Sequence, residues 1–261
     1  MEMSMLLTLI AIWITCYYPK SVPSNINRKI SDYVEIKHIL IQHQRKVIVA
    51  EDEEDFQRIN IRRRHVFSYT LRAFSKPSFN VGKLLKVKFI GEVATVDDGG
   101  PRREFFSLLM KDIFLESGLF SGWPSNVVVL HNIQALSKNH YYCVGKMLSV
   151  CIIQGGLSPS CFCVAIADFL VHGSVRVPAA INDIPDHDVQ QLLFKVQEAA
   201  TNEDLKVLLS RPDYQFIYDC GYSKPADSHT MKDRDDLIRS VWLYYIFFHP
   251  HAALEQLRVG F

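Results

Sequence analysis

The stretch DDGGPRREFF, residues 97–106, constrains the fold of this chain more than any other part of the sequence. Gly99 and Gly100 allow the backbone to turn sharply. Pro101 fits the first turn of a helix, where the N–H group that proline lacks would have no helical partner. Apolar residues then recur at helical spacing, at Phe105, Leu108 and Leu109. The stretch therefore predicts a tight turn followed by a helix that runs to about Glu116.

Charged residues around the two glycines decide between a structural and a ligand-binding interpretation. Asp97 or Asp98 can cap the first amides of the helix, and Glu104 suits the positive end of the helix dipole. A phosphate-binding loop would need the pattern G-x-x-x-x-G-K-S/T or G-x-G-x-x-G, and the sequence contains neither. Two carboxylates beside the glycines would also repel a phosphate. We therefore interpret the stretch as the start of a packed helix.

Periodicity along the rest of the chain predicts an α+β fold that is mainly helical. Alternation predicts short strands near residues 59–61, 85–90 and 126–130. Helical spacing predicts helices over residues 31–44, 66–74, 139–154, 158–171 and from about 235 onward, the last one broken at Pro250. Glycines at positions 155, 156 and 173 are expected to end two of these helices.

Composition narrows the possible functions. The chain has 261 residues and a hydrophobic fraction of 48%, which is enough for a substantial core. Its 29 basic and 28 acidic residues nearly cancel, whereas a nucleic-acid binder normally carries a marked basic excess. The sequence has no G-x-S-x-G motif, and no two of its six cysteines have C-x-x-C spacing. We expect no metal site and no cofactor.

Cys161, in the segment SPSCFCVAI, is the most tempting candidate for a nucleophile. It follows a predicted helix start at Ser158 and Pro159, where the helix dipole would lower the pKa of a thiol. Its neighbours Phe162 and Val164 are apolar, however, which favours a buried and inert thiol. We interpret Cys161 as structural.

Residues 1–55 form an N-terminal extension that the sequence leaves unassigned. The apolar run from Met5 to Cys16 has the length of a signal-peptide core and is too short to span a bilayer. No Lys or Arg precedes it and no small-x-small cleavage site follows, so a buried helix or a misjudged start of the reading frame are the alternatives. The acidic run at residues 51–55 and the basic triplet at residues 62–64 are interpreted as solvated charges.

Several segments, in order, resemble the N-terminal lobe of HECT-type ubiquitin ligase domains over residues 56–261. The segments are INIRRRHVF, LKVKFIGE, DDGGPRREFF, YYCVGKMLSVCIIQGG, LSPSCFCVAIADFLVHG and PHAALEQLRVGF. The second is the strand, the third the turn, and the third is the most specific. The residues that match the signature are Gly99, Gly100, Pro101, Arg103, Glu104 and Phe105.

The resemblance implies a function. A domain of this kind accepts ubiquitin from a conjugating enzyme onto a cysteine and passes it to a lysine of a protein substrate. The N-terminal lobe docks the conjugating enzyme through a small subdomain, expected here at about residues 176–232. The catalytic cysteine belongs to a second lobe, which we expect to lie beyond Phe261, so no cysteine of this chain inherits that role.

Two functions remain open on this resemblance. The chain is either the docking part of a HECT-type ligase, inactive alone, or an interaction module that sequesters a conjugating enzyme as a decoy. The expected partners are a ubiquitin-conjugating enzyme, ubiquitin and a protein substrate, without nucleic acid or membrane. The family works in the cytoplasm and nucleus, which is where we expect this chain.

Overall fold

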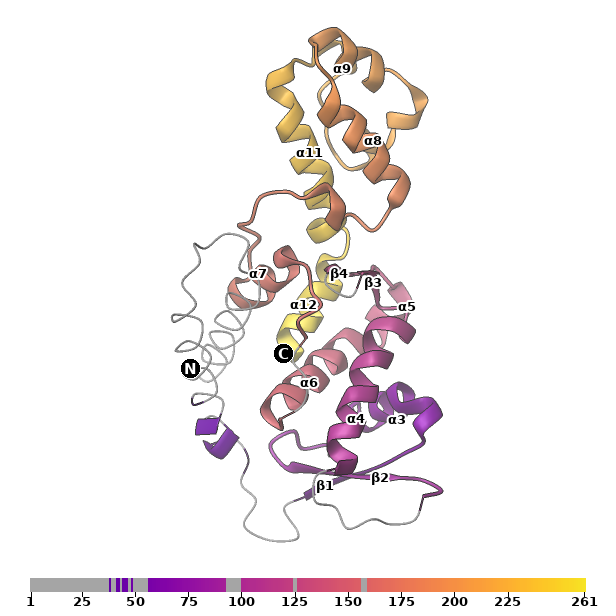
Figure 1. The fold of residues 1–261 in the computed structure, drawn as a ribbon, viewed down its shortest axis with the longest axis vertical. Helices are drawn as coiled ribbons and strands as arrows, with labels where there is room; N and C mark the ends of the chain where they lie inside the picture. The colour runs from indigo at the N-terminus through magenta and orange to yellow at the C-terminus, as the bar shows by residue number, and fades with distance from the viewer. Residues whose placement is uncertain are drawn as a thin grey trace.

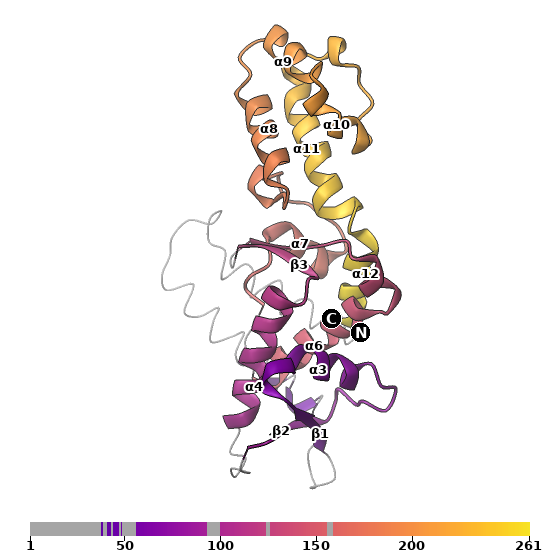
Figure 2. The ribbon, with the colours of Figure 1, turned by 90° about the vertical axis from the view of Figure 1, so that its right-hand side faces the viewer.

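The computed structural model describes residues 38, 41–42, 44–46, 48, 56–92, 100–123, 126–155 and 159–261. This part of the chain is mainly helical with a few short strands, as the sequence predicts. Most helices pack into a larger body, from which a smaller group of helices projects (Figures 1 and 2). None of the helices described combines the length and hydrophobicity that a bilayer crossing requires.

A parallel pair of strands with a helix between them forms one end of the body. The elements are β1 (Phe56–Ile61), η3 (Arg63–His65), α3 (Val66–Phe74) and β2 (Leu84–Phe89). The register places Ile59 beside Val87 and Ile61 beside Phe89. These four side chains are buried, whereas the residues between them on each strand are more exposed. Both strands and the helix agree with the prediction, although β1 begins three residues earlier than expected.

The helix predicted from DDGGPRREFF is present as α4 (Gly100–Lys111), followed by one π-helical turn, η4 (Asp112–Glu116). The predicted end near Glu116 is therefore confirmed. Asp112 is the polar break in the apolar pattern, and its Oδ2 accepts a hydrogen bond from the backbone N–H of Phe67 at 3.2 Å. Because Phe67 lies in the first turn of α3, Asp112 satisfies one of the amides that a helix start leaves unpaired. The predicted caps, Asp97 and Asp98, and Gly99 lie outside the described residues.

An antiparallel hairpin connects α4 to the central helices. It consists of β3 (Phe120–Trp123) and β4 (Asn126–Val129), followed by the short α5 (Ile133–Ser137). The strand near residues 126–130 was predicted, whereas β3 was not. Val127 also pairs with the segment around Phe162, since its N–H donates to the Cys161 carbonyl at 2.7 Å and its carbonyl accepts from the Cys163 N–H at 2.9 Å.

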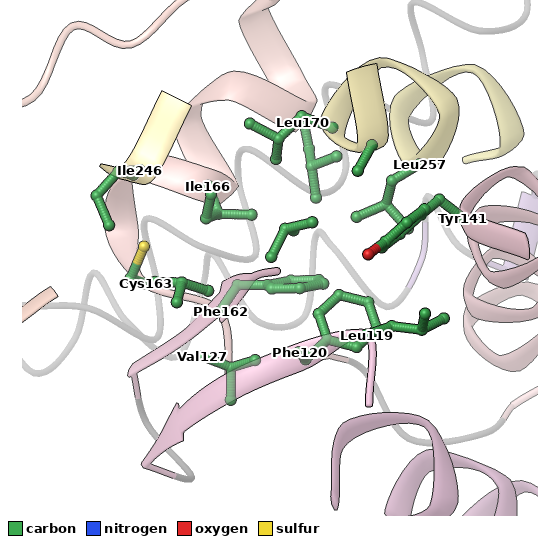
Figure 3. Close-up of a cluster of buried hydrophobic side chains, with 14 of the residues drawn as sticks. Leu119, Phe120, Val127, Tyr141, Phe162, Cys163, Ile166, Leu170, Ile246 and Leu257 are labelled. Atoms are coloured by element: carbon green, nitrogen blue, oxygen red, sulfur yellow. The ribbon is translucent and has the colours of Figure 1, made fainter. Parts of the chain in front are cut away.

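This pairing corrects one prediction. The helix expected to begin at Ser158 and Pro159 begins only at α7 (Val164–His172), because Cys161–Cys163 is extended alongside β4. The end of α7 is as predicted, since Gly173 adopts a left-handed conformation with φ of 70°. The side chain of Phe162 packs against the ring of Phe120 at 5.9 Å, in the centre of the cluster in Figure 3.

Two long helices, α6 (His140–Ile153) and α12 (His251–Gly260), pack against each other in the body. Helix α6 ends before Gly155, which has φ of 80°, as predicted; Gly156 lies outside the described residues. Helix α12 follows Pro250, where the predicted break occurs. Leu254 and Leu257 of α12 and Met147 and Leu148 of α6 are fully buried.

The projecting group, which we call the helical projection, comprises α8 (His187–Glu198), α9 (Asn202–Leu209), α10 (Phe216–Asp219) and α11 (Arg234–Leu243). Short 3-10 turns link these helices, namely η5 (Ile181–Asp183), η6 (Pro212–Tyr214), η7 (Ala226–Ser228) and η8 (Met231–Asp233). A π-helical segment, η9 (Tyr244–Phe248), joins α11 to α12 and the body. The projection overlaps the stretch predicted as a small subdomain, whose boundaries stay a prediction.

The calls on the N-terminal extension, from the apolar run of residues 5–16 to the acidic run of residues 51–55, lie outside the described residues. Of the helix predicted over residues 31–44, only His38, Ile41, Gln42 and Gln44 are described, and all are helical.

Candidate functional site

The first candidate is the signature stretch at the start of α4. Phe105 and Phe106 are buried in the core, with ring centroids 5.3 Å apart. Arg103 and Glu104 are exposed on the other side of the helix. The apolar half of the stretch therefore anchors α4, while its charged half faces solvent.

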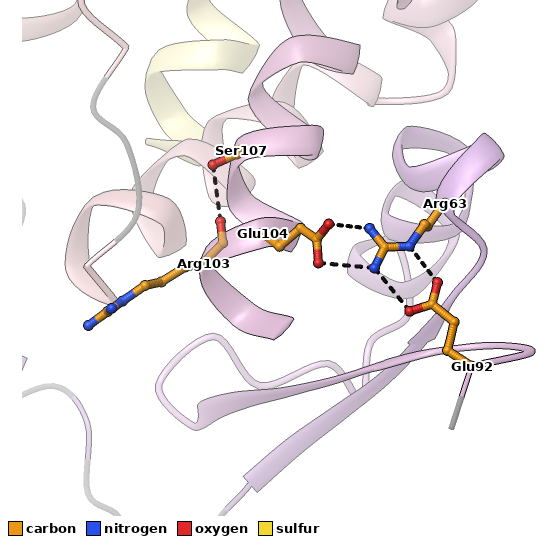
Figure 4. A network of polar contacts seen from close by, with 5 residues as sticks. All are labelled: Arg63, Glu92, Arg103, Glu104 and Ser107. Atoms are coloured by element: carbon orange, nitrogen blue, oxygen red, sulfur yellow. Dashed lines mark hydrogen bonds and ion pairs between the residues drawn. The ribbon is translucent and has the colours of Figure 1, made fainter. Parts of the chain in front are cut away.

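Glu104 belongs to a three-residue ion-pair network with Arg63 and Glu92 (Figure 4). The Nη2 of Arg63 donates to Glu92 Oε2 at 2.9 Å and to Glu104 Oε2 at 3.0 Å, and Nε and Nη1 donate to the other carboxylate oxygens. These hydrogen bonds from Arg63 lower the pKa of both carboxyl groups below the ordinary value. The guanidinium also lies 4.2 Å from the centre of the Phe89 ring.

The network links three elements that are distant in sequence. Arg63 begins η3, Glu92 follows β2, and Glu104 lies in the first turns of α4. Arg103 points away from the network in Figure 4, and its backbone carbonyl accepts a hydrogen bond from Ser107 Oγ at 3.1 Å. Because all the donors of Arg63 already face carboxylates, this arrangement joins the strands to α4 and offers no free cationic site for a ligand.

The cysteines that the structure describes are poorly suited to nucleophilic chemistry. Burial raises the pKa of the Cys161 thiol to about 12, and burial likewise raises the pKa of Cys163 to about 12. Cys151 is fully buried, and its pKa is raised for the same reason. Since the thiolate is the reactive form, these thiols are almost entirely protonated and inert near neutral pH.

Metal binding has no better basis in the described residues, where no three His, Cys, Asp or Glu side chains lie close enough to hold an ion. The nearest approach to such a site is a pair of imidazoles, His131 and His249, whose ring centres are 4.8 Å apart. They line a pocket of about 690 Å³ between the hairpin, the start of α8 and η9. Burial and the neighbouring His131 lower the pKa of His249.

The second candidate is a groove on the helical projection. Two capping residues fix the helices that form it. Asp186 Oδ1 accepts from the amides of Asp188 and Val189 at the start of α8, and Thr201 and Asp204 form a reciprocal capping box at the start of α9. The loop between the two helices is therefore short and well defined.

The groove lies where the end of α8 meets α9, and its volume is about 500 Å³. We call it the α8–α9 groove; it is lined by Lys195, Glu198, Ala199, Ala200, Glu203, Asp204, Val207 and Leu208. Val207 is 62% exposed although it is aliphatic, and Leu208 beside it is half-buried. The groove thus combines an apolar floor with a mainly acidic rim. The sequence did not identify it, because a leucine or valine on a groove has the same helical spacing as one in the core.

Comparison with known proteins places the chain near one class of enzyme, the ubiquitin ligases. No protein-family model matches the chain. Over 206 residues, or 78% of its length, the chain is 29% identical to the G2/M phase-specific E3 ubiquitin-protein ligase of Homo sapiens and to that of Macaca fascicularis. It is 27% identical over 137 residues to the probable E3 ubiquitin-protein ligase HUL4 of Eremothecium gossypii.

These relatives confirm the resemblance that the sequence motifs predict: the chain is similar to a HECT-like ubiquitin ligase region. The motifs resemble most the subgroup to which the G2/M phase-specific ligases belong. The chain spans only about 28% of the length of those relatives, however. What the complete relatives do is therefore a basis for a proposal about this chain, and no more.

Proposed function

We propose that this chain is the part of a HECT-type ubiquitin ligase that docks a ubiquitin-conjugating enzyme, and that none of its six cysteines carries ubiquitin. The likeness to E3 ubiquitin-protein ligases over 206 residues carries this proposal. The burial that raises the pKa of the described thiols supports its second half. Partners of the complete ligase would be ubiquitin and a protein substrate, in the cytoplasm or nucleus.

The α8–α9 groove is the docking site that the geometry supports best. An aliphatic side chain as exposed as Val207 gains free energy when a partner covers it. Glu198, Glu203 and Asp204 on the rim favour a partner that presents basic residues around an apolar one, because opposite charges at a rim steer association and fix its orientation. We therefore place the apolar anchor of the conjugating enzyme against Val207 and Leu208.

Binding measurements with a panel of ubiquitin-conjugating enzymes test the proposal. At least one enzyme should bind the chain, and Val207→Asp should weaken that binding roughly tenfold or more, since loss of a central apolar contact typically costs more than about 1 kcal/mol. Val259→Asp is the matched control, because Val259 is 60% exposed on α12, in the body. No binding to any member of the panel, or equal loss in both variants, would contradict the docking site.

A thioester assay separates a docking part from a catalytic one. A conjugating enzyme charged with ubiquitin should transfer no ubiquitin to the chain, so no adduct that reducing agent removes should form. An adduct that disappears in Cys161→Ala would overturn our assignment of that thiol. The decoy alternative predicts in addition that the chain slows ubiquitin transfer by a complete ligase when both compete for the same conjugating enzyme.

A further inference from the structure

The two-stranded sheet has one face covered by helices and one face open. In Figures 1 and 2 the helices of the body lie to one side of β1 and β2. The side chains that point toward them are apolar and buried, namely Ile59, Ile61, Leu85, Val87 and Phe89. The residues between them point the other way, since successive side chains of a strand alternate between its two faces.

Four basic residues occupy this open face, which we call the basic sheet face: Arg58, Arg62, Lys86 and Lys88. Arg58, Arg62 and Lys88 are exposed, and Lys86 is half-buried with its Nζ 3.8 Å from the centre of the Phe56 ring. The parallel register places Arg58 beside Lys86 and Asn60 beside Lys88. Arg62 directly follows β1 in an extended conformation, so it continues the same row.

No carboxylate balances these charges within the described residues. Arg58, Arg62 and Lys88 make no hydrogen bond or ion pair with any described residue, and neither residues 56–62 nor 84–90 contain Asp or Glu. The contrast with Arg63 is direct, since that neighbour lies between two carboxylates. Like charges on adjacent strands are mutually unfavourable. An anionic partner would relieve that repulsion.

Apolar side chains flank the basic residues on the same face. Phe56 and Leu84 are half-buried at one end, and Ile90 is 43% exposed at the other. A partner that fits this face therefore needs negative charge along its centre and apolar groups as well. That combination is found in acidic protein segments that also contain aliphatic or aromatic residues.

We propose that the basic sheet face binds an extended acidic segment of a partner protein. Along each strand, residues on one face recur every second position, about 6.6 Å apart. An extended peptide repeats its own side chains at the same interval, so alternate acidic residues can meet successive basic ones. An anionic lipid surface shares the charge but not the interval, and the contact of Lys86 with Phe56 holds one cation close to the sheet. The proposal does not rest on conjugating-enzyme docking.

Fluorescence anisotropy with the full chain tests this inference. The probe is a labelled peptide of alternating glutamate and valine, and the control peptide has glutamine in place of glutamate. The acidic peptide should bind saturably, and the glutamine peptide should not. Binding should weaken steeply with added salt, since the screening length falls from about 10 Å at 0.1 M to about 3 Å at 1 M.

Paired variants decide whether this particular face is responsible. Arg58→Gln with Lys88→Gln should weaken binding of the acidic peptide roughly tenfold, because it removes one cation from each strand. Lys111→Gln with Lys138→Gln removes the same net charge from exposed positions outside the sheet and should leave binding within about twofold. The exposed side chains involved leave the core intact, which circular dichroism of all four single variants would verify.

Three results would overturn the proposal. The two double variants could weaken binding equally, which would show a nonspecific effect of net charge. The glutamine peptide could bind as well as the acidic one. Vesicles containing phosphatidylserine could bind the chain through the same four residues while the acidic peptide does not, which would assign the face to a membrane surface instead.

Discussion

The packing of α6 against α12 depends on two glycines, Gly145 and Gly260. A Cβ atom at position 145 would lie 2.8 Å from the carbonyl carbon of Gly260 and from the backbone nitrogen of Phe261, and closer still to the carbonyl oxygen of Leu257. A Cβ atom at position 260 would collide in the same way with the backbone of Tyr142. Both helices therefore approach so closely that neither position has room for a methyl group.

Gly145→Ala is accordingly expected to destabilise the protein, against the usual preference of helices for alanine. Ordinary contact begins at 3.4 Å, so the helices would have to separate by at least 0.6 Å (3.4 Å less 2.8 Å), and by more to clear Leu257. Over-packing costs about 1–3 kcal/mol, and we take the upper value of about 3 because backbone atoms cannot rotate away. Alanine returns about 1 kcal/mol of helix propensity. The expected net loss of unfolding free energy is about 2 kcal/mol, or a fall in Tm of about 4–8 °C.

Urea denaturation followed by circular dichroism measures this loss directly. Gly100→Ala is the matched control, because a Cβ atom there would meet nothing within 4 Å, and its unfolding free energy should change by less than about 1 kcal/mol. Gly260→Ala should resemble Gly145→Ala, and the double variant should lose less than the sum because one separation of the helices relieves both collisions. Gly145→Ala as stable as the wild-type chain would refute the close approach of α6 and α12.

Three further predictions concern polar contacts and thiols. In Arg63→Gln, stability should be lower than in wild type near pH 7 and should converge with it as pH falls to about 3, because Arg63 keeps the pKa of Glu92 and Glu104 low and that stabilisation is lost on protonation; a urea midpoint gap that stays constant with pH would contradict this. Gln154→Leu should cost about 2 kcal/mol in urea unfolding, because the buried Leu85 N–H loses its acceptor at 2.9 Å; Gln134→Leu, at an exposed position, should change little. Iodoacetamide should modify Cys161 slowly in the native chain and rapidly in urea, since burial raises its pKa to about 12; equal rates would show that the thiol is accessible.

Local structure in this chain follows from the sequence at many positions. Alternation in LLKVKF identifies β2 because a half-exposed strand buries every second residue, and Leu85, Val87 and Phe89 are the buried ones. Gly173 ends α7 because glycine tolerates the positive φ that a helix end requires. Phe105 and Leu109 are buried as their spacing predicts.

Contacts between distant segments were not accessible in this way. The basic triplet looks uniform in sequence, but its members diverge: Arg62 lies in the open sheet row, Arg63 between two glutamates, and Arg64 is exposed. The α8–α9 groove was likewise invisible, because its exposed Val207 and the buried Leu205 occupy similar places in one helical pattern. Family resemblance supplied the expectation of a docking surface but named no residue on it.

Cys161 shows where the two sources of information meet. The sequence by itself determined that the SPSCFCVAI segment is apolar and that its thiols would be buried, since apolar side chains leave water wherever the chain allows it. Only the tertiary structure decided that the segment runs extended beside β4 instead of beginning a helix. The reason is that a strand needs hydrogen-bond partners from another part of the chain, and Val127, more than thirty residues earlier, provides them.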